Sequence, residues 1–350
     1  MESLWFALVA AMLATYVVLD GFDFGVGMLH PFVARTDDER RQVLAAIGPV
    51  WDGNEVWLLA SGGTLFFAFP LAYASAFSGF YLPLMMVLWL LVMRGISIEF
   101  RSHDPSPLWR AFWDATLFVS SALMALILGA ALGNVIRGVP LGGSGWFQVP
   151  LFTNFLPGRD AGVLDWYTVL VGAFAVCALL AHGALYLCWK TSGPVRDRAA
   201  RAASRALVGV ALLLVLVTAA TTTVQVGLFA SLARRPWSWP LPLLSAAGLA
   251  VALVGHRRGR ERLAFLGSCG FLFFLLAATA AGVYPVLLRS TVSARYNLTA
   301  AAAATSEYGL RAGLSWWLIG IPLAAGYFTF LFRSMAGKVG HPGERSPGPR

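Results

Sequence analysis

Long apolar segments dominate this sequence and constrain its fold more than any other feature. A helix needs about 20 mostly apolar residues to cross the hydrocarbon core of a bilayer. Nine segments come close to this length or exceed it, namely residues 5–31, 54–72, 76–98, 112–135, 164–188, 205–227, 238–255, 263–288 and 313–333. The sequence therefore predicts an all-α integral membrane protein with nine transmembrane helices. They would form one membrane domain of residues 1–335, followed by a disordered cytoplasmic tail of residues 336–350.

The low charge content excludes the common classes of water-soluble protein. Only 12% of the residues are charged, against about 25% in an ordinary soluble domain. A net charge of +9 would suggest nucleic-acid binding on a soluble domain. In a membrane protein an excess of positive charge is first explained by the Lys and Arg residues of the cytoplasmic loops. No nucleic-acid partner is therefore predicted. The three cysteines form no CxxC pair, and there is no HExxH motif, so no metal site is predicted either.

The positive charges are unevenly distributed between the two sets of connecting segments. If the N-terminus lies outside, the inside segments hold 19 of the 26 Lys and Arg residues and the outside segments hold seven. Cytoplasmic loops of membrane proteins collect Lys and Arg. The distribution therefore predicts an outside N-terminus, a cytoplasmic C-terminus and an odd number of spans.

Asp20 and Asp23 lie inside the first apolar segment, where an ionisable side chain is costly and indicates function. Their spacing puts both carboxyl groups on one face of a helix. One interpretation is a proton-accepting pair, and the other is a set of hydrogen bonds that hold helices together at the membrane edge. Gly21 and Gly25 form a GxxxG step, which lets another helix approach closely.

Asp52 and Glu55 lie at the start of the second apolar segment, with Asn54 between them. Asp-x-x-Glu is a capping-box-like arrangement, and a carboxylate there also complements the helix dipole. Proton uptake is compatible with the same placement. Both interpretations therefore remain open for these acids.

The third and fourth apolar segments add further charges. Arg94 and Arg101 lie near the end of the third, where cations favour a helix C-terminus, so both are candidate anchors. Glu99 lies between them and is a candidate ion-pair partner. Asp114 follows Arg110 by four residues, which predicts an i, i+4 ion pair.

His182 lies in the fifth apolar segment, and a buried neutral histidine can ligate haem. A lone histidine is more often a helix-contact residue, and we favour that interpretation. The other histidines are at helix ends or in loops and complete no bis-histidine site: His30, His103, His256 and His341. The residues alone thus fit a proton-handling subunit or a proton-coupled transporter.

Four motifs resemble subunit II of cytochrome bd-type quinol oxidases, and more closely the cyanide-insensitive branch of that family. They are DGFDFGVG at 20–27, WDGNEVW at 51–57, FSGFY at 77–81 and RGISIEFR at 94–101. The motifs occur in family order with similar spacing and cover the first 135 residues well. Beyond them, AHGALYL at 181–187 is a weaker local match.

The resemblance implies a subunit of a membrane-bound terminal oxidase that takes electrons from quinol and reduces O₂ to water. Subunit I of the family carries the b and d haems and the quinol-oxidising loop, so this chain is expected to ligate no haem and to have no catalytic residues of its own. The implied fold is two four-helix bundles plus one extra helix. It would pack against subunit I in the bacterial inner membrane, with lipid, quinone and a small accessory subunit as further neighbours.

The resemblance also implies a cytoplasmic proton-entry route toward the haems. The matching acids are Asp20, Asp23, Asp52 and Glu99, and Glu99 stands where other members carry Asp. The supporting polar residues are Asn54, Glu55, Arg94, Arg101 and Asp114. The alternative functions are a proton-coupled secondary transporter and a purely structural assembly subunit.

Overall fold

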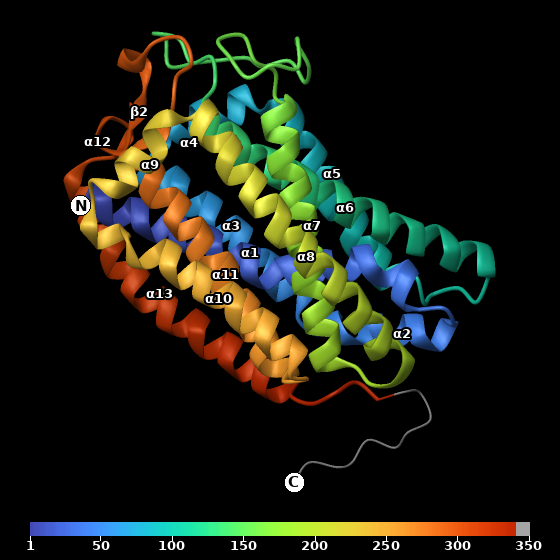
Figure 1. Cartoon of the computed structure of the whole chain (residues 1–350). Helices are drawn as coiled ribbons and strands as arrows, with labels where there is room; N and C mark the ends of the chain where they lie inside the picture. The colour runs from blue at the N-terminus through green and yellow to red at the C-terminus, as the bar shows by residue number, and fades with distance from the viewer. Residues whose placement is uncertain (341–350) are drawn as a thin grey trace.

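The computed structural model describes residues 1–340, whose regular structure is almost entirely helical (Figure 1). The helices are α1 (Glu2–Val33), α2 (Asp37–Ile47), α3 (Trp51–Ala68), α4 (Pro70–Gly79), α5 (Tyr81–Phe100), α6 (Pro107–Arg137), α7 (Trp166–Lys190), α8 (Gly193–Val224), α9 (Val226–Ala233), α10 (Pro240–Arg257), α11 (Glu261–Val283), α12 (Ala300–Ala303) and α13 (Glu307–Ser334). Two 3-10 helices, η1 (Pro236–Ser238) and η2 (Ala294–Tyr296), interrupt the connections. Strands β1 (Val286–Leu288) and β2 (Leu298–Thr299) form a short antiparallel pair in which Val286 lies opposite Thr299.

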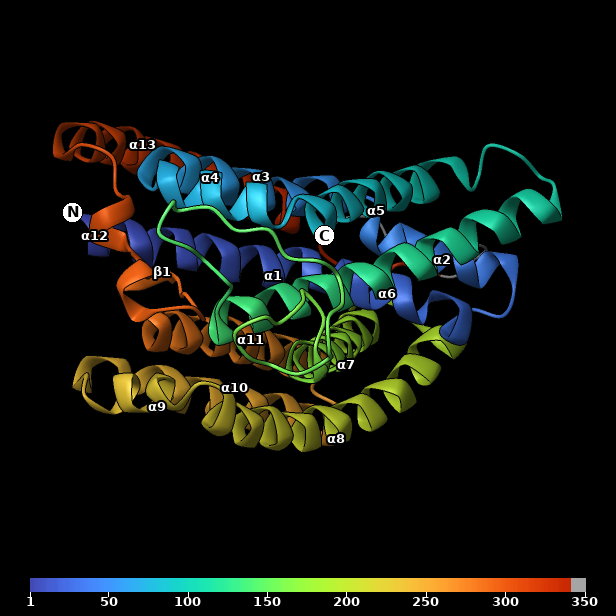
Figure 2. The same cartoon turned by 90° about the horizontal axis from the view of Figure 1, so that it is seen from above.

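Helices α1 and α7 run through the middle of the molecule. The most apolar stretch of α7 is 61% buried, the largest share among the candidate spans. Helix α1 packs against α3, α6, α7 and α11. Seen from above, α3, α5 and α13 cover one side of this centre and α8 and α10 cover the other (Figure 2). Polar groups on α1 are therefore surrounded by other helices.

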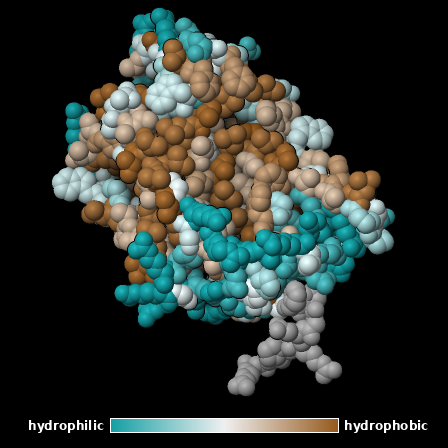
Figure 3. All heavy atoms as spheres, turned by 45° about the vertical axis from the view of Figure 1, so that its right-hand side comes forward, coloured by the Kyte–Doolittle hydropathy of each residue, from teal (hydrophilic) through white to brown (hydrophobic). Residues whose placement is uncertain are grey.

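Eight helices of the described chain are long and apolar enough to cross a membrane: α1, α5, α6, α7, α8, α10, α11 and α13. Figure 3 agrees with this, since hydrophobic side chains form the middle of the visible surface and hydrophilic ones gather along its lower end. The predicted segment 54–72 corresponds to α3, which is not among the eight. Its first turns carry Asp52, Asn54 and Glu55, which lower its hydropathy. The chain is thus a helical integral membrane protein.

The chain reversal after α3 differs from the prediction. The predicted segments 54–72 and 76–98 leave only residues 73–75 for the reversal between them, but these residues are helical and belong to α4. Pro70 explains the break, because proline has no N–H and restricts the residue before it, yet it suits the first turn of a helix. Helix α3 therefore ends at Ala68, and α4 begins at Pro70.

Two further segments have different ends from those predicted. Segment 205–227 is part of α8, which begins earlier, at Gly193, and ends at Val224, where Gln225 separates it from α9. Segment 263–288 is shortened, since α11 ends at Val283 and the strand β1 follows. Pro285 explains the second difference, because it disfavours helical backbone at the residue before it.

The first residues of the segment 336–350, for which the sequence predicts a disordered tail, make contacts with α7. The Lys190 ammonium group donates to the carbonyl oxygens of Met335 and Gly337, at 2.6 and 3.0 Å. The Val339 N–H donates in turn to the Lys190 carbonyl. Residues up to 340 are therefore tied to the end of α7, and the predicted tail from 341 to 350 lies outside the described residues.

Candidate functional site

A buried arginine holds two acids from two different helices. Arg94 on α5 donates from Nη1 to Asp20 on α1 at 2.5 Å, and from Nη2 to Glu55 on α3 at 2.8 Å. Arg94 and Asp20 are fully buried, whereas the Glu55 side chain is 23% exposed. The guanidinium group also lies over the Phe24 ring, 4.4 Å from its centroid. Arg94 is therefore an ion-pair centre between three helices, and the anchoring interpretation of this residue is wrong.

The second acid of α1 is bound next to this centre. Asn54 on α3 donates from Nδ2 to the Asp23 carboxylate at 2.8 Å, and both side chains are buried. One carboxyl oxygen each of Asp20 and Asp23, the Asn54 amide oxygen and the Tyr16 hydroxyl have no hydrogen-bond partner within residues 1–340. These atoms keep the capacity to bond to water. We call Asp20, Asp23, Asn54, Glu55 and Arg94 the buried acid cluster.

The glycines of α1 let α7 pack directly against this helix. A Cβ atom at Gly25 would collide with the Leu179 carbonyl and with Gly183, so the backbones of α1 and α7 touch here. The predicted GxxxG step is thus a helix-packing site, because only a residue without a side chain permits this approach.

His182 links α7 to two other helices. Its Nε2 lies 2.9 Å from the Val18 carbonyl of α1, and its Nδ1 lies 2.7 Å from the Ser268 hydroxyl of α11. A carbonyl can only accept, so a neutral ring carries its proton on Nε2. The Ser268 hydroxyl lies within hydrogen-bonding distance of both His182 Nδ1 and the Phe265 carbonyl, and its single proton serves one of them. Both ring nitrogens are engaged, which fits the helix-contact interpretation and leaves neither free for haem iron.

Asp114 lies in a second charged cluster, where it does not pair with Arg110 as the sequence predicted. It accepts from Arg40 on α2 and from Arg101, which directly follows α5, each at 2.6 Å, and His30 Nε2 is 3.5 Å away. An i, i+4 spacing makes a pair possible but does not select it over partners from other helices. Arg101 is 1% exposed and is therefore a structural ion-pair residue rather than a simple anchor.

Asp37 at the start of α2 completes this second cluster. It accepts from Arg101 at 2.9 Å and from Arg110 at 3.0 Å. Partial burial would raise the pKa of Asp37, but the hydrogen bond and charge of Arg101 outweigh it. The charges of Arg110 and Arg41 act in the same direction, so the pKa is lowered overall. Asp37 is therefore an ionised structural acid.

The two remaining predicted acids lie apart from the buried acid cluster. Asp52 is exposed in the first turn of α3, and Glu99 is exposed near the end of α5. Within residues 1–340 neither side chain takes part in a hydrogen bond or an ion pair, so the predicted pairing of Glu99 is wrong. Asp52 forms no capping box, since α3 begins after Val50 without a side-chain cap. Its position still complements the helix dipole.

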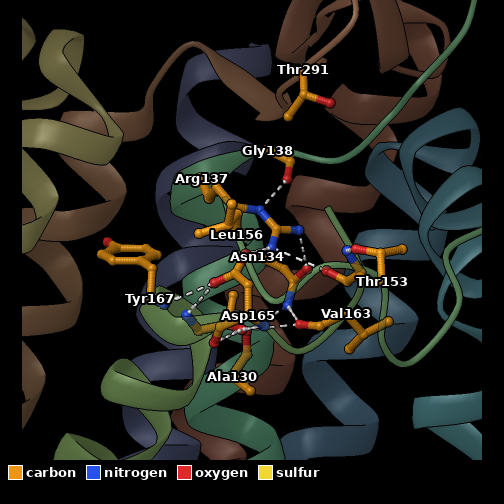
Figure 4. Close-up of polar contacts among 12 residues, drawn as sticks. Ala130, Asn134, Arg137, Gly138, Thr153, Leu156, Val163, Asp165, Tyr167 and Thr291 are labelled. Carbon is orange, nitrogen blue, oxygen red and sulfur yellow. Dashed lines mark hydrogen bonds and ion pairs between the residues drawn. The ribbon is translucent and has the colours of Figure 1, made fainter. Parts of the chain in front are cut away.

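A third buried charged group, at the opposite end of the bundle, was not anticipated. The Arg137 guanidinium pairs with Asp165, and it also bonds to the carbonyl oxygen of Gly162 and the side chain of Asn134 (Figure 4). Asp165 in turn caps α7 by accepting from the N–H groups of Tyr167 and Thr168. The only signal in the sequence was the Asp165-x-x-Thr168 spacing of a capping box. This group fastens the 138–164 connection to α6 and α7.

These features match those of a known family. The sequence model of the family described as cytochrome bd terminal oxidase subunit II matches residues 1–335. The chain belongs to this family. The sequence-based prediction of subunit II of a bd-type quinol oxidase is thereby confirmed, and the chain is a subunit of an oxidoreductase complex.

Named relatives of the bd oxidase chain cover nearly its whole length. The probable cytochrome oxidase subunit 2 of Haemophilus influenzae is 30% identical over 96% of this chain and 94% of that protein. Subunit 2 of the cytochrome bd-I ubiquinol oxidase of Escherichia coli K12 is 29% identical with the same coverage. Subunit 2 of the cytochrome bd ubiquinol oxidase of Bacillus subtilis is 30% identical over 89% of this chain and 88% of that protein.

A solved bd oxidase has the same fold. A chain of the bd oxidase from Geobacillus thermodenitrificans superposes with a TM-score of 0.74, covering 95% of this chain and 97% of that chain. Its sequence identity is 17%, so the match supports the fold and not individual residues. Membership of the subunit II family implies a partner subunit I in the complex.

Proposed function

We propose that this subunit carries protons from the cytoplasm toward the oxygen-reducing site of subunit I, through the buried acid cluster. The observation that carries the proposal is the placement of Asp20 and Asp23, both buried within the apolar helix α1. Arg94 joins Asp20 to the partly exposed Glu55, and Asp23 is bonded to Asn54 beside them. Chains of acidic side chains within transmembrane segments are typical of proton relays.

The charges in the buried acid cluster favour proton binding. The cluster holds three carboxyl groups but one guanidinium group: Asp20 and Glu55 bond to Arg94, whereas Asp23 bonds to the neutral Asn54 amide. A buried unpaired charge costs several kcal/mol, so the excess negative charge is relieved when a carboxyl group binds a proton. Arg94 stays protonated and therefore positions the acids rather than passing protons itself.

Asp52 and Glu55 supply the entrance to this path. They lie three residues apart on α3 and hence on one helix face, with Asp52 exposed and Glu55 bonded to Arg94. A proton taken up at Asp52 passes through water to Glu55, then to Asp20 and to the unbonded oxygen of Asp23. Glu99 at the end of α5 adds negative charge to the same side of the membrane.

We extend the proposal to the topology and the substrate by analogy with the family. Nine crossings, the eight candidate spans and α3, would form two four-helix bundles and one extra helix, with the N-terminus outside and the C-terminus in the bacterial cytoplasm. The relatives are named ubiquinol oxidase subunits, and by analogy the complex oxidises quinol. The haems, when bound in subunit I, supply electron transfer and O₂ reduction. This chain supports subunit I and delivers protons to it.

The test is the turnover of purified oxidase containing Asp20→Asn or Asp23→Asn. Each isostere keeps the side-chain volume and removes the proton site, so quinol-dependent O₂ uptake should fall about tenfold or more. Asp52→Asn should lower turnover as well. Haem absorption spectra should stay normal, and Asp20→Glu should restore part of the turnover and shift its pH profile.

Asp37→Asn is the matched control, because Asp37 is also paired to arginine but lies on α2, outside the apolar helices. It should leave turnover and its pH profile close to the wild type. Wild-type turnover with normal haem spectra in both the Asp20 and Asp23 variants would refute the proton path. Loss of haem in those variants, with no change in the pH profile, would favour the structural assembly role. Solute uptake by the chain alone in liposomes would favour the transporter.

A further inference from the structure

The connection between α10 and α11 forms a surface hollow that the proton path does not use. Its volume is about 440 Å³, and it is lined by Trp189, Arg260, Glu261, Arg262, Leu263 and Leu266. Glu261 is paired with Arg196 at the start of α8 and with Lys338 after α13, so the hollow lies where these helix ends meet. We propose that it binds the phosphate headgroup of an anionic phospholipid.

The charge of the hollow suits a phosphate. Arg260 and Arg262 are exposed, and neither guanidinium group has a hydrogen-bond or ion-pair partner within residues 1–340. Glu261 is the one acid of the lining, and it already accepts from Arg196 at 2.8 Å and from Lys338 at 2.6 Å. The hollow is therefore positively charged. A guanidinium group binds a phosphate with two parallel N–H···O hydrogen bonds. Basic pockets between transmembrane helices commonly hold anionic headgroups.

The apolar part of the lining distinguishes a lipid from a small soluble phosphate. Leu263 and Leu266 are 40% and 51% exposed and lie one turn apart on the outward face of α11. Trp189 stacks on Phe265, with ring centroids 5.4 Å apart, which fixes the indole at the edge of the hollow. Tryptophan is enriched at membrane interfaces. Acyl chains would cover the leucines, whereas inorganic phosphate would leave them exposed.

The proposal is tested on the purified oxidase complex after detergent exchange to remove lipid. Phosphatidylglycerol is titrated back and its binding is measured by native mass spectrometry, with phosphatidylcholine as a zwitterionic lipid of the same chain length. The wild type should bind phosphatidylglycerol more tightly than phosphatidylcholine. The double variant Arg260→Gln and Arg262→Gln should bind phosphatidylglycerol about tenfold more weakly or worse.

The neighbouring pair Arg257→Gln and Arg258→Gln is the matched control, since it removes the same charge from exposed residues outside the lining. It should weaken binding by less than about threefold. Equal losses in both double variants would overturn the proposal, because binding would then be diffuse attraction to a basic surface. Oxygen uptake should be unchanged in both, which separates this result from failure of the proton path.

Inorganic phosphate provides the second arm of the test. If inorganic phosphate binds the wild type as tightly as phosphatidylglycerol does, the site recognises a soluble anion and the lipid proposal is overturned. Leu266→Asn should weaken phosphatidylglycerol binding while leaving any effect of phosphate unchanged. Equal lipid binding by the Leu266 variant and the wild type would contradict the role given to the acyl chains.

Discussion

Arg94 is the residue on which the buried charges depend. Its planar guanidinium group bonds to Asp20 and Glu55 with two different nitrogens and faces the Phe24 ring. A lysine has the same charge, but it cannot offer two donors in a rigid fork. The side chain therefore contributes geometry as well as charge.

We expect Arg94→Lys to destabilise the complex by about 1.5–3 kcal/mol, the value of one charge-assisted hydrogen bond. Arg110→Lys is the control, because Arg110 is partly exposed and pairs only with Asp37 within residues 1–340. Arg110→Lys should lower the free energy of unfolding by less than about 1 kcal/mol. The check is thermal or denaturant unfolding of the purified complex, and equal losses in the two variants would contradict the role given to Arg94.

Glu39 of α2 should make stability depend on pH. Partial burial opposes the shift, but hydrogen bonds from Arg198 and from the N–H groups of Arg35 and Thr36 lower the pKa of this carboxyl group. A carboxyl group whose pKa is lower in the folded state stabilises that state at pH values above its unfolded pKa of about 4.3. This stabilisation is lost as the pH falls through the folded pKa.

The measurement for Glu39 is the Tm of the wild type and of Glu39→Gln between pH 7 and pH 3.5. The wild type should be more stable at pH 5–7, and the difference should shrink below about pH 4. A difference that stays constant down to the lowest pH would show that the carboxylate charge is not the cause.

The acids of the site could be predicted from the sequence, but their partners could not. Asp20 and Asp23 stand out because they interrupt an apolar segment. The pairing of Arg94 with Asp20 joins residues 74 positions apart and depends on which helices meet. For the same reason the sequence suggested the local partner Arg110 for Asp114, whereas the structure gives it Arg40 and Arg101.

At the scale of elements, the contact between α1 and α7 depends on two glycines that touch, Gly25 and Gly183. Gly25→Ala should destabilise the subunit by about 3 kcal/mol or more, because the methyl group meets backbone that cannot rotate away. Gly326→Ala on α13 is the control, since a Cβ there meets nothing within 4 Å. The yield and the Tm of the complex measure both effects, and a Gly25 variant as stable as the control would contradict the close approach.

Apolar length predicted where most helices lie, to within a few residues. Apolar length did not predict the helix ends that depend on polar contacts or on proline. Helix α8 extends back to Gly193 through polar residues whose contacts are with other elements, such as Arg198 with Glu39. Helix α4 was missed because a short helix at the membrane edge has the same composition as the end of a span.

At the scale of the whole molecule, the unequal distribution of Lys and Arg predicts opposite locations for the two ends of the chain. In Figure 1 the N-terminus and the end of α13 lie at opposite ends of the bundle. A fluorescent protein fused after Ser334 should fluoresce, and alkaline phosphatase at the same position should be inactive. Phosphatase fused within the 138–164 connection should be active. Active phosphatase at both positions would contradict nine crossings.

The buried acid cluster draws all its members from the part of the chain that precedes Phe100. A ribosome releases these residues first, so the acids of α1 and α3 are able to meet Arg94 before the later helices are complete. The Lys190 contacts with Met335 and Gly337 can form only after almost all of the chain has emerged. The order in which these contacts become possible therefore runs from the buried acid cluster to the contacts that fasten the end of α13.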